Sequence, residues 1–234
     1  MLGLKAFHNK LPILCLKAID MTMKIMESTA GPIASKLMEI GAIKLNHENP
    51  FTWSSGWKSP VYCDNRLSLS YPNIRSYIKQ CLAQAVRENF ADVQAIAGVA
   101  TAGIPQGALV AQELELPFLY VRPKPKDHGL ENLIEGKLDK GQRVVLIEDL
   151  ISTGGSSLKA ATALRDAGAI VSGMVAIFTY RFDIAEQNFE KEGINLVCLS
   201  DFPHLLEVAL QNKFINQAQL THIMAWRKDP GNWK

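Results

Sequence analysis

The chain has 234 residues, of which 47% are hydrophobic and 21% charged, a balance that allows one sizeable buried core. Its formal net charge is only +2, so composition gives no general basis for binding the phosphate backbone of nucleic acids. No apolar stretch approaches the roughly 20 residues that a membrane-spanning helix needs. We therefore expect neither a nucleic-acid partner nor a membrane partner.

The N-terminal segment and the cysteines indicate the cellular compartment. Residues 1–26 are expected to be a poorly defined N-terminal extension, because Pro12 interrupts their apolar run and no small-residue cleavage pattern follows. The four cysteines show neither CxxC spacing nor a Cys/His metal pattern, which favours a reducing, cytoplasmic environment. They are Cys15, Cys63, Cys81 and Cys198.

From residue 70 onward, amphipathic segments alternate with short apolar runs. Ile74, Ile78 and Leu82 recur at four-residue spacing after Pro72, which predicts a helix with one buried face. Nearly continuous apolar runs predict strands that are covered on both faces, at 95–100, 116–121, 143–150, 170–180 and 195–200. Helical patterns follow the first and third of these runs, and the tail to Trp226 also reads as helical. The pattern favours an α/β fold with a doubly wound, mainly parallel sheet.

The strongest local signal is VVLIEDLISTGGSS, residues 144–157. Its apolar strand delivers Glu148 and Asp149 to the carboxyl edge of the sheet, where open α/β folds bind ligands. Small and hydroxyl residues follow at the start of a helix, where backbone N–H groups and the helix dipole favour a phosphate. Carboxylates beside a phosphate site would repel it unless they faced hydroxyls or a metal ion, so a phosphorylated sugar fits both halves. The alternative is an ordinary strand-to-helix turn with solvated acids.

A basic connection of about twenty residues, 122–142, is too long for an ordinary strand connection. We call it the basic loop. It carries Arg122, Lys124, Lys126 and His128. In isolation such a loop would be read as a solvated charge cluster, but its place opposite a phosphate motif favours a role in binding.

Residues 144–157 closely resemble the phosphoribosyl diphosphate (PRPP) signature of the type I phosphoribosyltransferases. Residues 120–129, YVRPKPKDHG, resemble the mobile catalytic loop of the orotate phosphoribosyltransferase family, and residues 51–66, FTWSSGWKSPVYCDNR, resemble its orotate-side segment. The resemblance extends from about Ile33 to about Arg181. It implies a phosphoribosyltransferase fold with a small N-terminal hood at about 27–70, a core at about 71–200 and C-terminal helices at about 201–228, all in a single domain from 27 to 234.

The resemblance also implies an activity, the transfer of a phosphoribosyl group from PRPP to orotate in pyrimidine synthesis. Glu148 and Asp149 would hold the ribose hydroxyls, and Asp149 would take part in catalysis. The 5-phosphate would bind Ser152, Thr153, Gly154, Gly155 and Ser156. The turn in GVATAGIP, formed by Thr101, Ala102 and Gly103, would present backbone N–H groups to the pyrophosphate.

Catalysis is expected to depend on the basic loop. Negative charge builds on the pyrophosphate as the bond to ribose breaks, and Arg122 and Lys126 can stabilise it while His128 donates a hydrogen bond or proton. A closed loop would also exclude water. In the family this loop reaches into the neighbouring subunit, which implies a homodimer with shared sites.

The acceptor side and the metal are implied by the same resemblance. Tyr62 would stack on orotate, with Cys63, Ser152 and Arg181 also contacting it. Magnesium would travel on PRPP, touching Glu148 or Asp149 through water at most. Glu148 stands where Asp is more frequent, and a lysine of some relatives is absent at Ser54, Ala102 and Pro123. Lys58 and Lys124 are candidates to compensate.

Two alternatives remain at this stage. A purine phosphoribosyltransferase would share the PRPP signature but should lack the KDHG loop and the 51–66 segment. A PRPP-sensing regulator would keep the phosphate cradle for binding alone, and we would expect it to lack the basic loop and to carry a nucleic-acid-binding patch or an appended domain.

Overall fold

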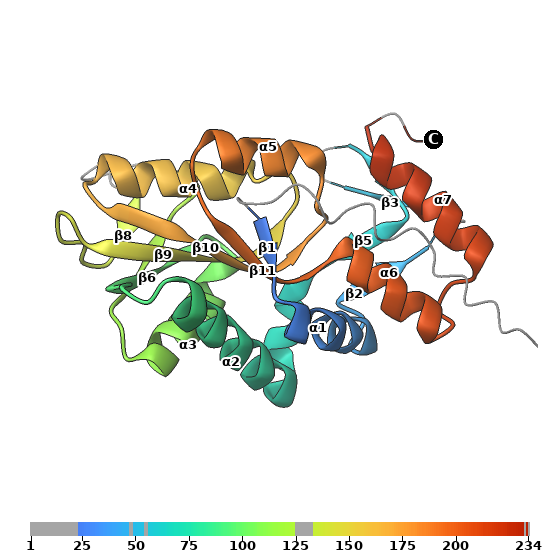
Figure 1. The fold of residues 1–234 in the computed structure, drawn as a ribbon, viewed down its shortest axis with the longest axis horizontal. Helices are drawn as coiled ribbons and strands as arrows, with labels where there is room; N and C mark the ends of the chain where they lie inside the picture. Colours follow the sequence, from blue (N-terminus) through green and yellow to red (C-terminus); the bar gives the residue numbers. More distant parts are fainter. Residues whose placement is uncertain (1–22, 47–48, 54–55, 125–132, 232, 234) are drawn as a thin grey trace, which may run out of the picture.

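The computed structural model describes residues 23–46, 49–53, 56–124, 133–231 and 233. Within this part of the chain, the centre of the molecule is a seven-stranded sheet in the order β1-β11-β10-β9-β6-β7-β8 (Figure 1). The strands are β1 (Met23–Ile25), β6 (Ala95–Val99), β7 (Phe118–Val121), β8 (Ile134–Glu135), β9 (Arg143–Ile151), β10 (Ile170–Thr179) and β11 (Leu196–Asp201).

The sheet is parallel except at one edge, where β8 pairs antiparallel with β7. The chain runs from β6 outward to β7, then crosses back to β9 on the other side of β6 and continues to β10 and β11. This reversal creates a switch point between β6 and β9, the place where open α/β sheets bind ligands. The predicted doubly wound sheet is confirmed.

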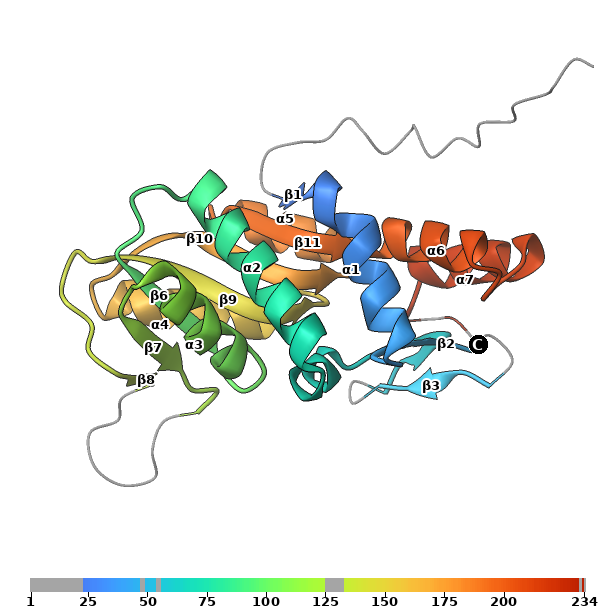
Figure 2. The same ribbon diagram turned by 90° about the horizontal axis from the view of Figure 1, so that it is seen from below.

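Helices cover both faces of the sheet (Figures 1 and 2). One face carries α1 (Glu27–Glu39), α2 (Pro72–Asn89) and α3 (Gly103–Leu114), and the other carries α4 (Gly155–Asp166) and α5 (Asp183–Lys191). Alternate residues of each strand point to opposite faces of the sheet and so contribute to two hydrophobic cores, one on each face. In β9, Val145 and Ile147 pack with α2, while Val144 and Leu146 pack with α4. Burial on both faces explains why the strands are almost uniformly apolar.

The hood consists of two small antiparallel sheets beside the C-terminal helices. They pair β2 (Ile43–Leu45) with β5 (Val61–Cys63), and β3 (Phe51–Thr52) with β4 (Lys58–Ser59). The 3-10 helix η2 (Asn65–Ser70) leads from the hood into α2, and α6 (Phe202–Gln211) and α7 (Gln217–Lys228) end the domain.

Aromatic packing joins the hood to α7 and to the end of β10. Trp226 of α7 is fully buried, lies with its ring centroid 5.7 Å from that of Trp53, and donates from its indole Nε1 to the carbonyl of Lys58 at 3.0 Å. Tyr180 lies 4.8 Å from the Trp53 ring. These edge-to-face and tilted contacts fix the hood against the carboxyl end of the sheet.

Three elements differ from the sequence-based expectation. Residues 23–25, assigned to the N-terminal extension, form β1 and pair with β11 at the sheet edge. Helix α1, expected in the hood, packs against β11 and α6 instead. Helix α5 was not anticipated. Residues 1–22 of the extension, Lys126 and His128 of the basic loop, and Ser54 of the hood lie outside the described residues.

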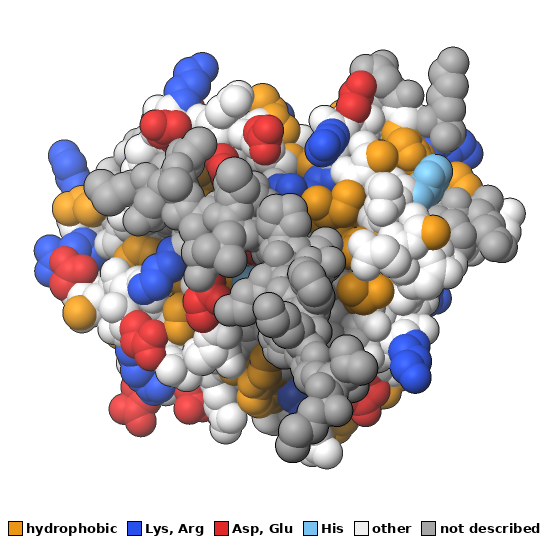
Figure 3. Space-filling model, turned by 45° about the vertical axis from the view of Figure 1, so that its right-hand side comes forward, with side chains coloured by type: hydrophobic (Ala, Val, Ile, Leu, Met, Phe, Trp, Pro, Cys, Tyr) orange, Lys and Arg blue, Asp and Glu red, His pale blue; other side chains and the backbone are white. Residues whose placement is uncertain are grey.

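The surface carries charges of both signs. On the face drawn in Figure 3, the described basic and acidic side chains are interspersed around the grey segments. Within the described part of the chain, no helix is long and apolar enough to cross a membrane.

Candidate active site

Two loops lie at the switch point, and a glycine brings the first of them against β9. The first follows β6 and contains Thr101 and Ala102; the second follows β9. Gly103 opens α3 so close to β9 that a Cβ atom there would overlap the carbonyl oxygen of Ile147 and lie 3.5 Å from the Cα atom of Glu148. The absence of a side chain therefore places the first loop directly beside the acidic end of β9.

The second loop is built as a phosphate cradle. Gly154 has φ +80°, and a Cβ there would also lie 2.7 Å from the Phe189 ring, so glycine is required on both grounds. Asn188 of α5 donates from Nδ2 to the carbonyl of Thr153 at 3.0 Å. Gly155 and Ser156 then begin α4, whose N-terminal N–H groups suit an anion. The loop residues named by the sequence thus lie together, and α5 positions them.

The paired acids stand at the end of β9 with little contact with water. Glu148 is 5% exposed; its Oε2 accepts from the Ser157 hydroxyl at 2.9 Å and its Oε1 from the Asp149 N–H at 3.0 Å. Burial, reinforced by the neighbouring Asp149 charge, raises the pKa of Glu148 well above its ordinary value. Burial also raises the pKa of Asp149. Two desolvated carboxyl groups at one edge favour a ligand that presents hydroxyls or a cation.

Asn65, which sequence reasoning missed, connects the hood to these acids. Its side chain is fully buried, donates from Nδ2 to the Asp149 carbonyl at 2.6 Å and accepts from the Cys63 thiol at 3.2 Å. Its own carbonyl accepts from the Ser68 hydroxyl at 2.6 Å. A polar residue between Asp64 and Arg66 gave no sequence signal of its own, since its partner lies 84 positions away.

We expect Asn65→Ala to lower the free energy of unfolding by about 1–3 kcal/mol, because it removes the buried amide that donates to the Asp149 carbonyl. Urea denaturation measures this, with Asn46→Ala as the control. Asn46 also accepts a hydrogen bond through its side chain, but on the exposed surface, from the Asn49 N–H. An equal decrease in the free energy of unfolding in the two variants would show that the buried bond to Asp149 stabilises the fold no more than an exposed hydrogen bond does.

A cavity of about 470 Å³ lies between the hood and the end of β9, and we call it the acceptor cavity. It is lined by Thr52, Trp53, Tyr62, Cys63, Arg66, Leu150, Ser152 and Tyr180. The structure thus brings together Tyr62, Cys63 and Ser152, three of the four residues predicted for the base. Tyr62 is 38% exposed and rests against the ring of Phe51, with centroids 5.5 Å apart, so one ring face is supported by protein.

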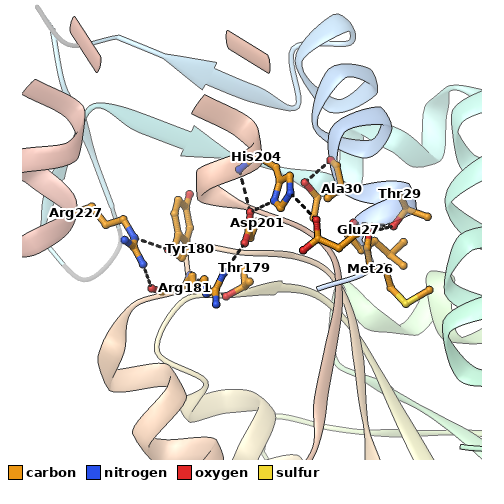
Figure 4. A network of polar contacts seen from close by, with 12 residues as sticks. Met26, Glu27, Thr29, Ala30, Thr179, Tyr180, Arg181, Asp201, His204 and Arg227 are labelled. Atoms are coloured by element: carbon orange, nitrogen blue, oxygen red, sulfur yellow. Dashed lines mark hydrogen bonds and ion pairs between the residues drawn. The ribbon is translucent and has the colours of Figure 1, made fainter. Parts of the chain in front are cut away.

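Arg181, the fourth predicted residue, does not line this cavity. Its guanidinium is bound by Glu186 at 3.2 Å. It is also bound by the fully buried Asp201 at 3.3 Å (Figure 4). His204 and its own N–H both contact Asp201, at 2.6 and 3.0 Å, and the bond to Asp201 raises the pKa of His204. Arg181 also has φ +54°, and its guanidinium lies against these acids rather than among the residues that line the acceptor cavity.

A second cavity, of about 800 Å³, borders the other side of the phosphate cradle. Gly155 and Ser156 line it from α4, Ala100 from the loop after β6, and Arg122 from the end of β7. Within the described part of the chain, Arg122 Nη1 is buried without a hydrogen-bond partner, and it lies 3.6 Å from the Glu135 carboxylate. An arginine with an unsatisfied N–H group in this cavity matches the predicted contact with phosphate oxygens.

Fold and site together define a class of enzyme, and the comparisons agree. Residues 68–200 match the family model described as the phosphoribosyl transferase domain, so the chain belongs to that family. The orotate phosphoribosyltransferase of Porphyromonas gingivalis is 58% identical over 208 residues, which cover 89% of this chain and 99% of the relative. Within the phosphoribosyltransferases, the chain therefore belongs to the orotate phosphoribosyltransferases, as the 51–66 and 120–129 segments predicted.

Solved structures support the same fold. The crystal structure of the Aeropyrum pernix orotate phosphoribosyltransferase is 31% identical with a TM-score of 0.69, and the match covers 79% of this chain and 99% of that one. The Leishmania donovani UMP synthase is 28% identical with a TM-score of 0.72 over 85% of this chain. This chain spans only 42% of the length of UMP synthase, so the likeness concerns one part of that protein.

Proposed function

We propose that this protein transfers the 5-phosphoribosyl group of PRPP to orotate, giving orotidine 5-phosphate and pyrophosphate for pyrimidine nucleotide synthesis. The observation that carries the proposal is the position of Ser152. It begins the phosphate cradle after β9 and also lines the acceptor cavity, so the phosphosugar and the planar base would meet at one residue. Holding both substrates in contact replaces a bimolecular encounter with a reaction inside one complex.

Different groups of residues in this chain bind different parts of PRPP. The cradle from Ser152 to Ser156 binds the 5-phosphate, and the backbone of Thr101–Gly103 binds the pyrophosphate. Glu148 and Asp149 accept hydrogen bonds from the ribose hydroxyls, and their charge favours the positive ribose that develops as pyrophosphate leaves. Arg122 stabilises the departing oxygens. The buried position of Glu148 supports this role, since dipoles and charges act more strongly where water is excluded.

Magnesium would enter with PRPP, and the site fits it. Among the described residues no group of three His, Cys, Asp or Glu side chains could hold a metal by itself. The two carboxyl groups supply the oxygen atoms that Mg²⁺ prefers, and both Glu148 oxygens already accept hydrogen bonds, which leaves contact through water. The ion would supply charge neutralisation on the phosphates.

We further propose a homodimer in which Lys126 and His128 of the basic loop act at the partner's site, in a reducing cytoplasm where Cys63, Cys81 and Cys198 carry free thiols. Lys126→Ala and Asp149→Asn homodimers should each be nearly inactive. Mixed dimers should regain activity, because one of their two sites then contains no substitution. An absence of recovery in verified mixed dimers would place the loop in its own subunit's site.

The decisive experiment follows the loss of orotate absorbance with purified protein, PRPP and Mg²⁺. Hypoxanthine, adenine and uracil serve as competing acceptors, and omission of PRPP or Mg²⁺ serves as control. Consumption of orotate alone is expected. PRPP binding without turnover of any base would instead favour the regulator, and turnover of a purine would assign a different acceptor.

A further inference from the structure

Of the described residues that line the acceptor cavity, Arg66 alone carries a positive charge. It lies at the start of η2, one residue after the buried Asn65 that is bonded to the Asp149 carbonyl. Its side chain is 61% exposed, so it reaches from a fixed backbone into the open part of the cavity. A planar base entering there would meet Tyr62 and this guanidinium.

Asp64 orients the Arg66 guanidinium through one edge only. Arg66 Nε donates to Asp64 Oδ1 at 2.6 Å and Arg66 Nη2 donates to Oδ2 at 2.9 Å. Asp64 Oδ1 also accepts from the Arg66 N–H at 3.2 Å, which fixes the carboxylate to the backbone. Nη1 has no acceptor within the described part of the chain, so the edge formed by Nη1 and the second N–H of Nη2 remains open. That edge matches a carboxylate with two parallel hydrogen bonds.

The charges around the cavity require such a cation if the base is an anion. Asp64 and Asp149 are both close to Cys63, and burial together with their charge keeps the pKa of the Cys63 thiol well above its usual range. Cys63 is therefore neutral and offers no positive charge. The charges of the two nearby acids would repel an incoming carboxylate, and the neutral Cys63 thiol would not attract it. The positive charge of Arg66 also acts on Asp149, where it offsets part of the rise in pKa that burial causes.

The other nearby cations, Arg181 and Lys58, are paired with other side chains and do not line the cavity. Arg181 is bound by Glu186 and by the fully buried Asp201. Lys58 Nζ donates at 2.8 Å to the hydroxyl of Thr52, which lines the cavity, but Lys58 itself is not among the lining residues.

We propose that the open edge of the Arg66 guanidinium binds the carboxylate of the acceptor base, with Asp64 as its positioning residue, and that this pair selects a carboxylated pyrimidine. The proposal rests on orotate being the acceptor. It assigns to Arg66 the contact that the sequence suggested for Arg181. Asp64 remains hydrogen-bonded to Nε and Nη2, and the substrate carboxylate binds the edge formed by Nη1 and the second N–H of Nη2.

Steady-state kinetics with orotate and uracil tests this assignment. Arg66→Gln should raise KM for orotate by about 10- to 100-fold, the cost of losing a hydrogen-bonded charge pair, with KM for PRPP changed less than threefold. The preference for orotate over uracil should fall by a similar factor, since uracil has no carboxylate to lose. Arg66→Lys should recover only part of it, because an ammonium lacks the planar fork. Asp64→Asn should give a smaller rise in KM for orotate.

Arg143→Gln is the matched control. Arg143 is also a surface arginine paired with a carboxylate, Asp92 at 2.9 Å, but it lies at the opposite end of β9. An unchanged orotate KM in Arg66→Gln, or an equal rise in Arg143→Gln, would overturn the proposal. The proposal would also be overturned if Arg181→Gln alone raised KM for orotate strongly without changing the melting temperature. Wild-type protein without orotate turnover would instead reject the proposed acceptor itself, which keeps the two failures separate.

Discussion

Glu148→Gln should lower kcat/KM for PRPP by about 100-fold and, without substrate, make the folded protein more stable at neutral pH. Activity falls because the amide lacks the charge that favours the ribose cation and can accept fewer hydrogen bonds from its hydroxyls. Stability rises because burying a charged carboxylate costs desolvation free energy, whereas a neutral amide avoids this cost and can keep both present hydrogen bonds. Its oxygen can accept from the Asp149 N–H and its nitrogen can donate to the Ser157 hydroxyl.

The pH dependence of this gain follows from the sign of the pKa change. Burial raises the pKa of Glu148 in the folded state, so the folded protein holds a proton that the unfolded chain releases near pH 4.3. Wild-type stability therefore declines as pH rises from the unfolded pKa to the folded pKa. The variant has no such loss. Its advantage should be absent near pH 4, grow as the pH rises, and level off above the folded pKa, at about 1.4 kcal/mol per pKa unit of elevation.

Urea denaturation at several pH values, with orotate turnover measured in parallel, checks both parts. Glu190→Gln on the exposed side of α5 is the control, because it also removes one carboxylate but from a solvated position. It should change neither stability nor turnover appreciably. A Glu148→Gln protein that is less stable than wild type at pH 8 would mean that the charge of Glu148 stabilises the empty site.

The phosphate cradle could be predicted from the sequence because its parts are contiguous. A buried strand, two acids and a run of small residues occupy residues 144–157, and their arrangement follows from local rules for strand ends and helix starts. The buried strands could also be predicted from the sequence, because helices cover both faces of the sheet and each strand is therefore a nearly continuous apolar run. The structure added helix α5, whose Asn188 holds the cradle in place.

The acceptor side could be predicted only in part, because its contacts join distant segments. Asn65 and the Asp149 carbonyl are far apart in sequence, and neither residue type predicts a contact with the other. Arg181 has the chemistry to bind a carboxylate, but the direction of its side chain depends on Asp201 and Glu186, which sequence order does not reveal. Strand β1 is three residues long, too short for an alternation pattern to show, and it exists through its pairing with β11.

Gly103→Ala should lower the free energy of unfolding by about 1–3 kcal/mol and raise KM for PRPP more than about 10-fold. On helix propensity alone, alanine at the first residue of α3 would be favoured over glycine. The new Cβ, however, meets the carbonyl oxygen of Ile147. Ile147 lies within β9, which is paired on one side with β6 and on the other with β10, so it has no room to withdraw. The loop after β6 must move instead, and it carries the N–H groups proposed for pyrophosphate.

Gly155→Ala separates this close approach from a general intolerance of alanine at the start of a helix. It is likewise the first residue of its helix, α4, but its Cβ would meet only the Thr153 hydroxyl at 3.8 Å, an ordinary contact. Its free energy of unfolding should equal or exceed that of wild type, measured by urea denaturation beside Gly103→Ala. Equal stability of the two variants would show that β9 can yield at Ile147. The close approach of the loop after β6 to β9 would then depend on something other than the missing side chain.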